Sequence, residues 1–383
     1  MLPELEPDSE GTLVGRVWRP GLGPALVRID GDRVADITSR AHPTMADLLA
    51  TKDPVAATRG AAGEEFCSVS DLLANSTPDA GPDDLRWLAP CDLQAIKACG
   101  VTFAASMVER VIEEKAAGDP DRAEAIRAKV GGIIGDSLAG LVPGSPEAAE
   151  VKRVLLAEGL WSQYLEVGIG PDAEVFTKSQ PMSSVGWGAA VGLHPVSTWN
   201  NPEPEIVLAV SPSGHIVGAT LGNDVNLRDV EGRSALLLGK AKDNNASCSI
   251  GPVIRLFDGG FTLDEVRAAH LTMTVAGTDG FDLTGASSMA EISRDPADLV
   301  AQTIGAHHQY PDGFMLFCGT MFAPVQDRDA PGQGFTHHVE DVVNISEPAL
   351  GTLSNTVRLS SDCPEWIFGT SALMRNLAAR NLL

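Results

Sequence analysis

Beyond residue 170 the chain is divided into short stretches of apolar and β-branched residues, each bounded by Gly, Pro, Asp or Ser. In chain order they read EIVLAV, HIVGATL, LTMTVAG, FMLFCG and VVNIS. Such stretches, separated by turn-forming residues, are typical of β-strands joined by short connections. One helix is expected among them, over 295–307. Because regular strand–helix alternation is absent, the pattern predicts a mixed α+β fold that is mainly β and largely antiparallel, not a doubly wound one.

Residues 1–88 also contain short apolar stretches bounded by turn-forming residues. The pieces TLVGRVW and PALVRI lie between clusters of Gly, Pro and Asp, which is typical of a small β-rich module. The segment STPDAGPDD at 76–84 reads as a linker. We therefore expect a small β-rich amino-terminal domain over 1–88 and a catalytic domain over 89–383.

Helical patterns occupy the region between these two β-rich parts. Helices are expected at 106–117, 120–130 and 145–160, which together form a helical insertion. In the first of them Ser106 is followed three residues later by Glu109, and this spacing matches a capping box at a helix start.

The charge balance excludes several classes of partner. Fifty-one acidic residues against twenty-eight basic ones give a formal charge of -23, which repels nucleic acid and anionic membrane surfaces. No basic and apolar leader opens the sequence, and no run of about 18 apolar residues could span a bilayer. The six cysteines form no CxxC pair, so we expect reduced, mostly buried thiols. A cytoplasmic protein that binds neither nucleic acid nor membrane is expected.

Two glutamates in NNPEPEIVLAV indicate a metal site. Glu203 and Glu205 are two residues apart, and Pro202 and Pro204 favour extended backbone, so both carboxylates leave the strand on one face. At about 3.3 Å per residue their Cα atoms lie roughly 7 Å apart. Carboxylate oxygens at this spacing can converge on one cation.

The following residues are expected to bring a third carboxylate to the same place. EIVLAV, the turn SPSG and HIVGATLGND read as an antiparallel hairpin. We place Val210 opposite His215. In that register Glu203 lies opposite Gly222, two residues before Asp224. The hairpin therefore predicts a cluster of three acids.

Three carboxylates without His or Cys nearby suit Mg²⁺, Mn²⁺ or Ca²⁺ and disfavour zinc or copper. Such a set leaves coordination positions for water or substrate, as a catalytic site requires. Two alternatives stay open: PEPE could be a solvated edge strand whose prolines discourage aggregation, or the acids could hold a structural calcium ion in a closed shell.

The motifs NPEPE, LGNDVNLRD, KAKDNNASCSIGP and PDGFMLFCGT, in this order, resemble those of the fumarylacetoacetate hydrolase family over about 90–383. The resemblance implies a β-roll fold and a homodimer or homotetramer. Residue by residue, it implies metal binding by Glu203, Glu205 and Asp224. It also implies an active-site lysine at Lys242 and substrate contacts from Ser106, Lys178, Gly319 and Thr320.

The stretches GVTFAASMVERVIEEKAAGD and QDRDAPGQGFTH are similar to a sub-family that dehydrates 2-dehydro-3-deoxy-pentonates. This similarity implies a magnesium-dependent lyase that forms 2,5-dioxopentanoate from the 2-keto-3-deoxy acid of D-xylonate or D-arabinonate. Hydrolytic family members carry a catalytic histidine where this chain has Ser106. The missing histidine disfavours hydrolysis, whereas a β-diketone or acylpyruvate hydrolase, a decarboxylase and an isomerase remain alternatives.

The implied substrate could chelate the ion through its 2-oxo group and carboxylate, which acidifies the C3 protons. As the base we favour Glu109, which shares a helix face with Ser106, over Lys242 and Glu114. Each residue also has a purely structural interpretation. Ser106 and Glu109 could only cap their helix, and Lys178 could be a surface charge.

Overall fold

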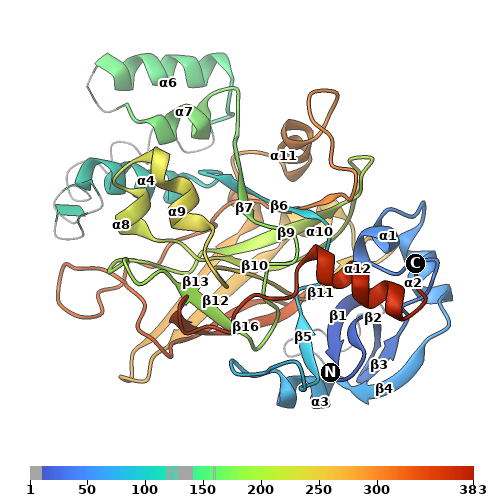
Figure 1. Cartoon of the computed structure of the whole chain (residues 1–383). Helices are drawn as coiled ribbons and strands as arrows, with labels where there is room; N and C mark the ends of the chain where they lie inside the picture. Colours follow the sequence, from blue (N-terminus) through green and yellow to red (C-terminus); the bar gives the residue numbers. More distant parts are fainter. Residues whose placement is uncertain are drawn as a thin grey trace.

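Two β-sheets form the centre of the molecule (Figure 1). The computed structural model describes residues 11–117, 119, 122, 123, 126, 141–157, 159 and 161–383, without the side chains of 104–106. The helix expected over 120–130 lies mostly outside these residues. Among the described residues, no helix is long and apolar enough to cross a membrane.

The larger sheet has eleven strands. In spatial order they are β4 (Glu64–Ser68), β3 (Arg33–Asp36), β2 (Gly23–Asp30), β1 (Leu13–Arg19), β11 (Cys248–Leu256), β10 (Ile216–Asp224), β9 (Pro204–Val210), β14 (Phe314–Phe317), β6 (Ala95–Gly100) and β7 (Glu174–Ser179), with β5 (Arg86–Leu88) beside β1. Of these pairs only β14 with β6 is parallel. The prediction of a mainly β, largely antiparallel fold is confirmed.

The second sheet has five strands and packs against the first. Their order is β13 (Asp282–Ser288), β12 (His270–Ala276), β15 (Val342–Glu347), β16 (Gly351–Leu359) and β8 (Ala190–Leu193). Leu208 of β9 and Leu221 of β10 share one apolar core with Met273 and Ile345 of this sheet. Val207 of β9 faces a second core on the other side. β9 is therefore buried on both faces, which explains why its sequence is continuously apolar.

Most of the helices that matter for the site gather at one end of the sheets (Figure 1). They are α4 (Ala104–Ala116), α6 (Pro146–Ala157), α7 (Gln163–Ile169), α8 (Arg228–Glu231) and α9 (Leu238–Lys242). The others are α1 (Met45–Leu49), α2 (Pro54–Gly60), α3 (Val69–Asn75), α10 (Leu263–Ala268), α11 (Pro296–Thr303) and α12 (Thr370–Ala379). α11 lies within the helix expected over 295–307, and α6 lies within that expected over 145–160.

The predicted start of α4 is wrong. The helix begins at Ala104 with Phe103 as its N-cap, which makes no side-chain capping bond, so Ser106 and Glu109 do not form a capping box. Tertiary contacts fix the entry of this helix instead. The Thr102 hydroxyl donates to the carbonyl of Cys318, and the Thr102 carbonyl accepts a hydrogen bond from the backbone amide of Ser293. These contacts override the local capping signal.

The amino-terminal strands continue the larger sheet. β1 pairs with β11 through Leu13 and Val14, and α12 lies beside the same strands, where the Asn376 amide donates to the Leu22 carbonyl (Figure 1). The division of the chain at residue 88 and the homo-oligomer both stay predictions.

Candidate active site

Three buried carboxylates meet where β9 and β10 adjoin. Glu203 directly precedes β9, Glu205 belongs to β9, and Asp224 ends β10. One oxygen of each lies within 4.8 Å of one oxygen of the other two. All three residues are at most 1% exposed. β9 lies inside the sheet, between β10 and β14, so the interpretation of PEPE as a solvated edge strand is wrong.

The hairpin forms as expected, but its register differs. Gly222 pairs with Glu205 rather than with Glu203. Asp224 then lies directly across from Glu203, and its amide donates to the Glu203 carbonyl at 3.0 Å. Glu203 and Asp224 are therefore direct cross-strand neighbours, whereas the predicted register separates them by two residues.

Two extra residues explain this difference. The turn is longer by one residue, because Val210 pairs with Ile216 and not with His215. A bulge at Val217 then adds the second residue. Since side chains alternate between faces with a period of two, a shift of two residues returns every side chain to its predicted face.

Two buried lysines neutralise part of this acidic cluster. Lys242, the last residue of α9, donates from Nζ to Glu203 Oε2 and, at 3.1 Å, to Asp224 Oδ2. Nζ of Lys178, in β7, lies 2.8 Å from Asp224 Oδ1 and donates to the carbonyls of Val225 and Lys242. Lys178 is fully buried, so its interpretation as a surface charge is wrong.

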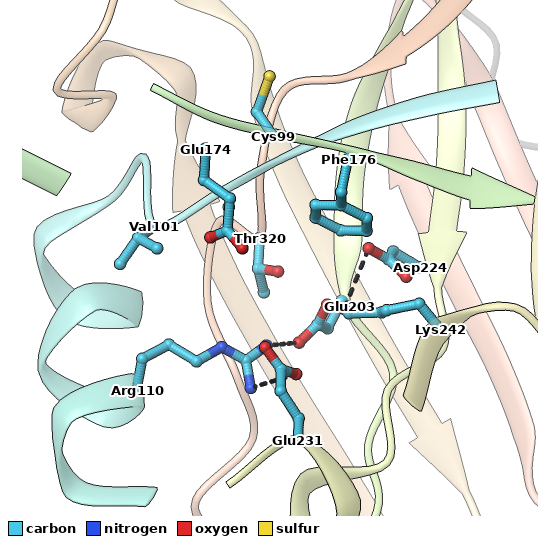
Figure 2. Close-up of a pocket in the computed structure, with 11 residues that line it drawn as sticks. Cys99, Val101, Arg110, Glu174, Phe176, Glu203, Asp224, Glu231, Lys242 and Thr320 are labelled. Carbon is cyan, nitrogen blue, oxygen red and sulfur yellow. Dashed lines mark hydrogen bonds and ion pairs between the residues drawn. The ribbon is translucent and has the colours of Figure 1, made fainter. Parts of the chain in front are cut away.

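Arg110 of α4 brings a third cation to the cluster, although the sequence patterns do not predict it. Its Nη2 donates to Glu203 Oε1, and its Nη1 lies 3.1 Å from Glu231 Oε2 (Figure 2). Nη1 also lies 2.6 Å from Glu113 Oε2. Glu113 also forms an ion pair at 2.9 Å with Arg228 of α8. α4 and α8 are thus tied together beside the three acids.

Gly319 and Thr320 reach the site as expected. The Gly319 amide donates to Glu205 Oε2 at 2.7 Å, and the Thr320 hydroxyl donates to Glu205 Oε1 at 3.3 Å. Both residues lie just beyond β14, the strand next to β9, and Cys318 separates them from its end. They fix the Glu205 side chain by two hydrogen bonds, and contact with a substrate stays a prediction.

Of the three candidate bases, the structure brings only Lys242 to the cavity beside the acids. Neither Glu109 nor Glu114 lines this cavity, and Glu114 accepts a hydrogen bond from Ser162 instead. Successive helical residues are rotated by about 100°, so the face that presents Arg110 directs its neighbour Glu109 elsewhere. The side chain of Ser106 lies outside the described residues. A catalytic role for Glu109 or Glu114 has no support from its position.

A small cavity lies directly over the cluster. It is lined by Cys99, Gly100, Val101, Arg110, Glu174, Phe176, Glu203, Asp224, Glu231, Lys242 and Thr320. In Figure 2 the carboxylate of Glu174, from β7, points into this space above Arg110 and Thr320. Gly100 makes room for it, because a Cβ at this position would overlap Glu174 Oε2.

Burial and neighbouring charges separate the pKa values of these acids. Burial raises the pKa of Glu174 to about 7, and the charge of Glu231 contributes to the rise. Burial likewise raises the pKa of Glu205, together with the charges of Asp224 and Glu203. For Glu203 burial also raises the pKa, but the charge of Lys242 helps to outweigh it, so the net shift is downward. Glu174 is thus an acid of the cavity whose pKa lies near neutral pH, and burial also raises the pKa of Glu231.

Lys242 itself remains an ammonium group. Burial lowers its pKa, but the charges of Asp224 and Glu203 outweigh burial, and the net pKa is raised. Of the two roles considered for Lys242, a fixed positive charge therefore suits this environment better than a neutral base.

The donor set and the charge of the cluster both fit a divalent cation. Among the described side chains in and around the cavity there are six carboxyl groups and four cations, so two negative charges remain when all six acids are ionised. The acids are Glu113, Glu174, Glu203, Glu205, Asp224 and Glu231, and the cations are Arg110, Lys178, Arg228 and Lys242. One divalent ion balances this excess, and three carboxylate oxygens are the ligands that a hard cation prefers.

Comparison with protein families agrees with this arrangement. Residues 195–358, which include all three acids, match the model described as fumarylacetoacetate (FAA) hydrolase C-terminal. This part of the chain is similar to that domain. Arg110 and Glu174, which also face the cavity, come from segments that precede this domain.

Two curated relatives of the chain are named as dehydratases. A probable 2-keto-3-deoxyxylonate dehydratase of Haloferax volcanii is 33% identical over 197 residues, which are 51% of this chain and 63% of the relative. A 2-dehydro-3-deoxy-D-arabinonate dehydratase of Saccharolobus solfataricus is 29% identical over 188 residues, 48% of this chain and 58% of the relative. In each case the match spans less than two thirds of the relative's length.

Solved structures share the fold over almost the whole chain. A 2-keto-3-deoxy-D-arabinonate dehydratase complexed with magnesium and 2,5-dioxopentanoate has a TM-score of 0.60 at 19% identity, with 91% of this chain and 99% of that chain covered. A 5-carboxymethyl-2-hydroxymuconate delta-isomerase of Mycobacterium smegmatis has a TM-score of 0.53 at 18% identity, with 90% and 98% covered. The fumarylacetoacetate hydrolase-like fold is confirmed.

Proposed function

We propose that this protein is a magnesium-dependent hydro-lyase that converts 2-dehydro-3-deoxy-D-pentonate, derived from D-xylonate or D-arabinonate, to 2,5-dioxopentanoate. The observation that carries the proposal is the cluster of Glu203, Glu205 and Asp224 beside a cavity. Two of these acids, Glu203 and Asp224, line the cavity together with Glu174, whose pKa burial raises to about 7. The names of the two curated relatives support the choice of substrate.

Glu203, Glu205 and Asp224 would hold the cation. When bound, a divalent cation polarises the 2-oxo group of the substrate and makes the C3 protons more acidic. The two hydrogen bonds from Gly319 and Thr320 orient Glu205 for this task.

Glu174 is the proposed proton carrier. As a carboxylate it accepts one proton from C3, and as the resulting carboxylic acid it donates that proton to the C4 hydroxyl group, which leaves as water. A pKa of about 7 suits both transfers, because near neutral pH the group can accept a proton as a carboxylate and donate it as a carboxylic acid. Loss of a C5 proton and tautomerisation, with a proton returned to carbon, then complete the 5-aldehyde. Water is the net product lost.

Lys242 contributes charge rather than proton transfer in this scheme. Its ammonium group is fixed by Glu203 and Asp224 at the edge of the cavity. A fixed cation in a buried site stabilises the negative charge that develops on the 2-oxygen as C3 loses its proton.

The test is incubation of the purified protein with Mg²⁺ and 2-dehydro-3-deoxy-D-pentonate, with 2,5-dioxopentanoate followed by chromatography. Parallel reactions contain the chelator EDTA, an acylpyruvate as an alternative substrate, or the Glu203→Gln variant. The proposal requires product with Mg²⁺ alone and none with EDTA or the variant. Cleavage of the acylpyruvate without dehydration of the pentonate would instead assign hydrolase activity.

A further inference from the structure

The guanidinium group of Arg110 has two ends with different partners. Nη1 lies between Glu113 and Glu231, whereas Nη2 donates to Glu203. Glu113 is itself held by the ion pair with Arg228. Two of the three carboxylates around Arg110 therefore do not belong to the proposed ligand set, and these two hold one end of the side chain in place.

Glu203 has a second function in the proposed reaction, because it is one of the three proposed ligands. A carboxylate that coordinates a divalent cation loses negative charge to the ion and becomes a weaker partner for a guanidinium. Nη2 of Arg110 then presents its N–H donors to the cavity, next to the carboxylates that bind the ion (Figure 2). A positive donor in a buried cavity requires a new anionic partner.

We propose that Arg110 binds the carboxylate of the 2-oxo acid and thereby makes the cavity selective for acids over neutral ketones. This inference rests on the proposed function, since it assumes an anionic substrate beside the bound ion. In this role Nη2 moves its hydrogen bond from Glu203 to the substrate, while Nη1 stays with Glu113 and Glu231.

The other cations are less suited to this role. The Nζ atom of Lys178 already faces Asp224 and two backbone carbonyls, so the three donors of its ammonium group all have partners. Both partners of Lys242, Glu203 and Asp224, are proposed ligands, so no carboxylate outside the ligand set holds its ammonium group in place as Glu113 and Glu231 hold Arg110. Arginine also presents a planar set of donors that matches a carboxylate, whereas lysine offers a point charge.

The position of Arg110 in the chain fits a role in specificity. It belongs to α4, before residues 195–358, which are similar to the fumarylacetoacetate hydrolase C-terminal domain. The proposed ion ligands lie inside that range. A substitution in a segment outside residues 195–358 leaves the proposed ion ligands unchanged.

The test uses two non-reacting probes, pyruvate and its neutral analogue pyruvamide. Binding of each is measured by calorimetry at saturating Mg²⁺, with ion binding to each protein titrated separately. The proteins are the wild type, Arg110→Lys and Arg110→Met. Arg153→Met is the matched control, because Arg153 is exposed and pairs only with Glu150 among the ion pairs of the described residues.

We expect the wild type and Arg153→Met to prefer pyruvate. Arg110→Met should bind pyruvate about 10- to 100-fold more weakly, as expected for loss of a charged hydrogen bond, with pyruvamide binding unchanged. Arg110→Lys should lie between. If Arg110→Met is unfolded, the double variant with Glu231→Gln, which removes one charge of each sign, takes its place.

Equal binding of the two probes by the wild type, or pyruvate binding by the methionine variant within threefold of the wild type, overturns the inference. These measurements need no turnover. Absence of dehydration by the wild type therefore contradicts the proposed function alone, and the two failures are distinguishable.

Discussion

The backbone amide of Gly319 donates a 2.7 Å hydrogen bond to Oε2 of Glu205. Gly319 has a φ of 105°, which favours glycine, and a Cβ there would overlap Oγ1 of Thr102. The Thr102 hydroxyl in turn donates to the carbonyl of Cys318. One glycine therefore orients a proposed ion ligand and allows close packing of the segment that leads into α4.

Replacing this glycine should damage both the ion site and the fold. Gly319→Ala adds backbone strain of about 1–3 kcal/mol, and the displaced amide should lower Mg²⁺ affinity by about 10- to 100-fold. Chemical denaturation and Mg²⁺ calorimetry measure the two effects. Gly259→Ala is the control, since a Cβ there meets nothing within 4 Å. Equal behaviour of the two variants would contradict the assigned role of Gly319.

Neutralising two acids of the cluster should change the stability of the ion-free protein in opposite directions. Glu205 is repelled by Asp224 and Glu203, so Glu205→Gln should raise the melting temperature. Glu203→Gln should lower it, because Lys242 and Arg110 lose a shared partner. Both variants should lose at least about 100-fold in Mg²⁺ affinity. Melting curves without Mg²⁺ test the expected rise for Glu205→Gln and the expected fall for Glu203→Gln. If Mg²⁺ still raises the melting temperature of either variant, that residue is excluded as a ligand.

Removing the buried Lys178 should cost far more stability than removing a half-exposed lysine. Lys178→Met leaves Asp224 without one of its two cations, which should lower the free energy of unfolding by about 3–5 kcal/mol. Lys152→Met, which removes the partially exposed pair with Glu166, should change it by less than about 1 kcal/mol. Urea titrations of the two variants provide the comparison, and similar losses would argue against a buried charge pair at Lys178.

The pH dependence of the proposed reaction should report Glu174. Its carboxylate form accepts the C3 proton, so kcat/KM should rise about tenfold per pH unit up to the pKa of about 7 and level off above it. Glu174→Gln should lower the rate by about 10²- to 10⁴-fold and abolish this acidic limb. Glu147→Gln, on the exposed first turn of α6, is the control. An unchanged acidic limb in Glu174→Gln would assign the titration to another group.

The acidic cluster could be predicted from local sequence because strand geometry is simple. Alternation puts Glu203 and Glu205 on one face, and a tight hairpin returns the chain to Asp224. The register could not be predicted, because the bulge at Val217 has no local signal that distinguishes it from regular pairing. The predicted set of three acids is still the correct one, because a register shift of two residues leaves every side chain on the same face of the sheet.

Arg110 is not predicted as a site residue, because the sequence pattern places the helix start at residue 106 and favours Glu109 as the base. A signal was present in the spacing. Met107, Arg110 and Val111 recur at the i, i+3 and i+4 positions of one buried face. A charged residue within such an apolar stripe indicates a buried ion pair, and the sequence does not reveal which partners it meets.

Glu174 could have been found from Lys178. The two residues lie four apart in β7, and alternation places residues four apart on the same face. Its position over the cavity, however, depends on the missing side chain of Gly100 in the neighbouring strand β6. This contact follows from sheet order, which short-range sequence patterns do not specify.

The origin of α4 outside residues 195–358 has an evolutionary consequence. The strands that carry the acids are buried on both sides, so almost any change to them is damaging. α4 meets Glu203 through the side chain of Arg110, so a substitution there changes the cavity without altering the strands that carry the acids. New substrate preferences would then arise by altering about one helix, which makes residues 104–116 the natural segment to exchange between relatives.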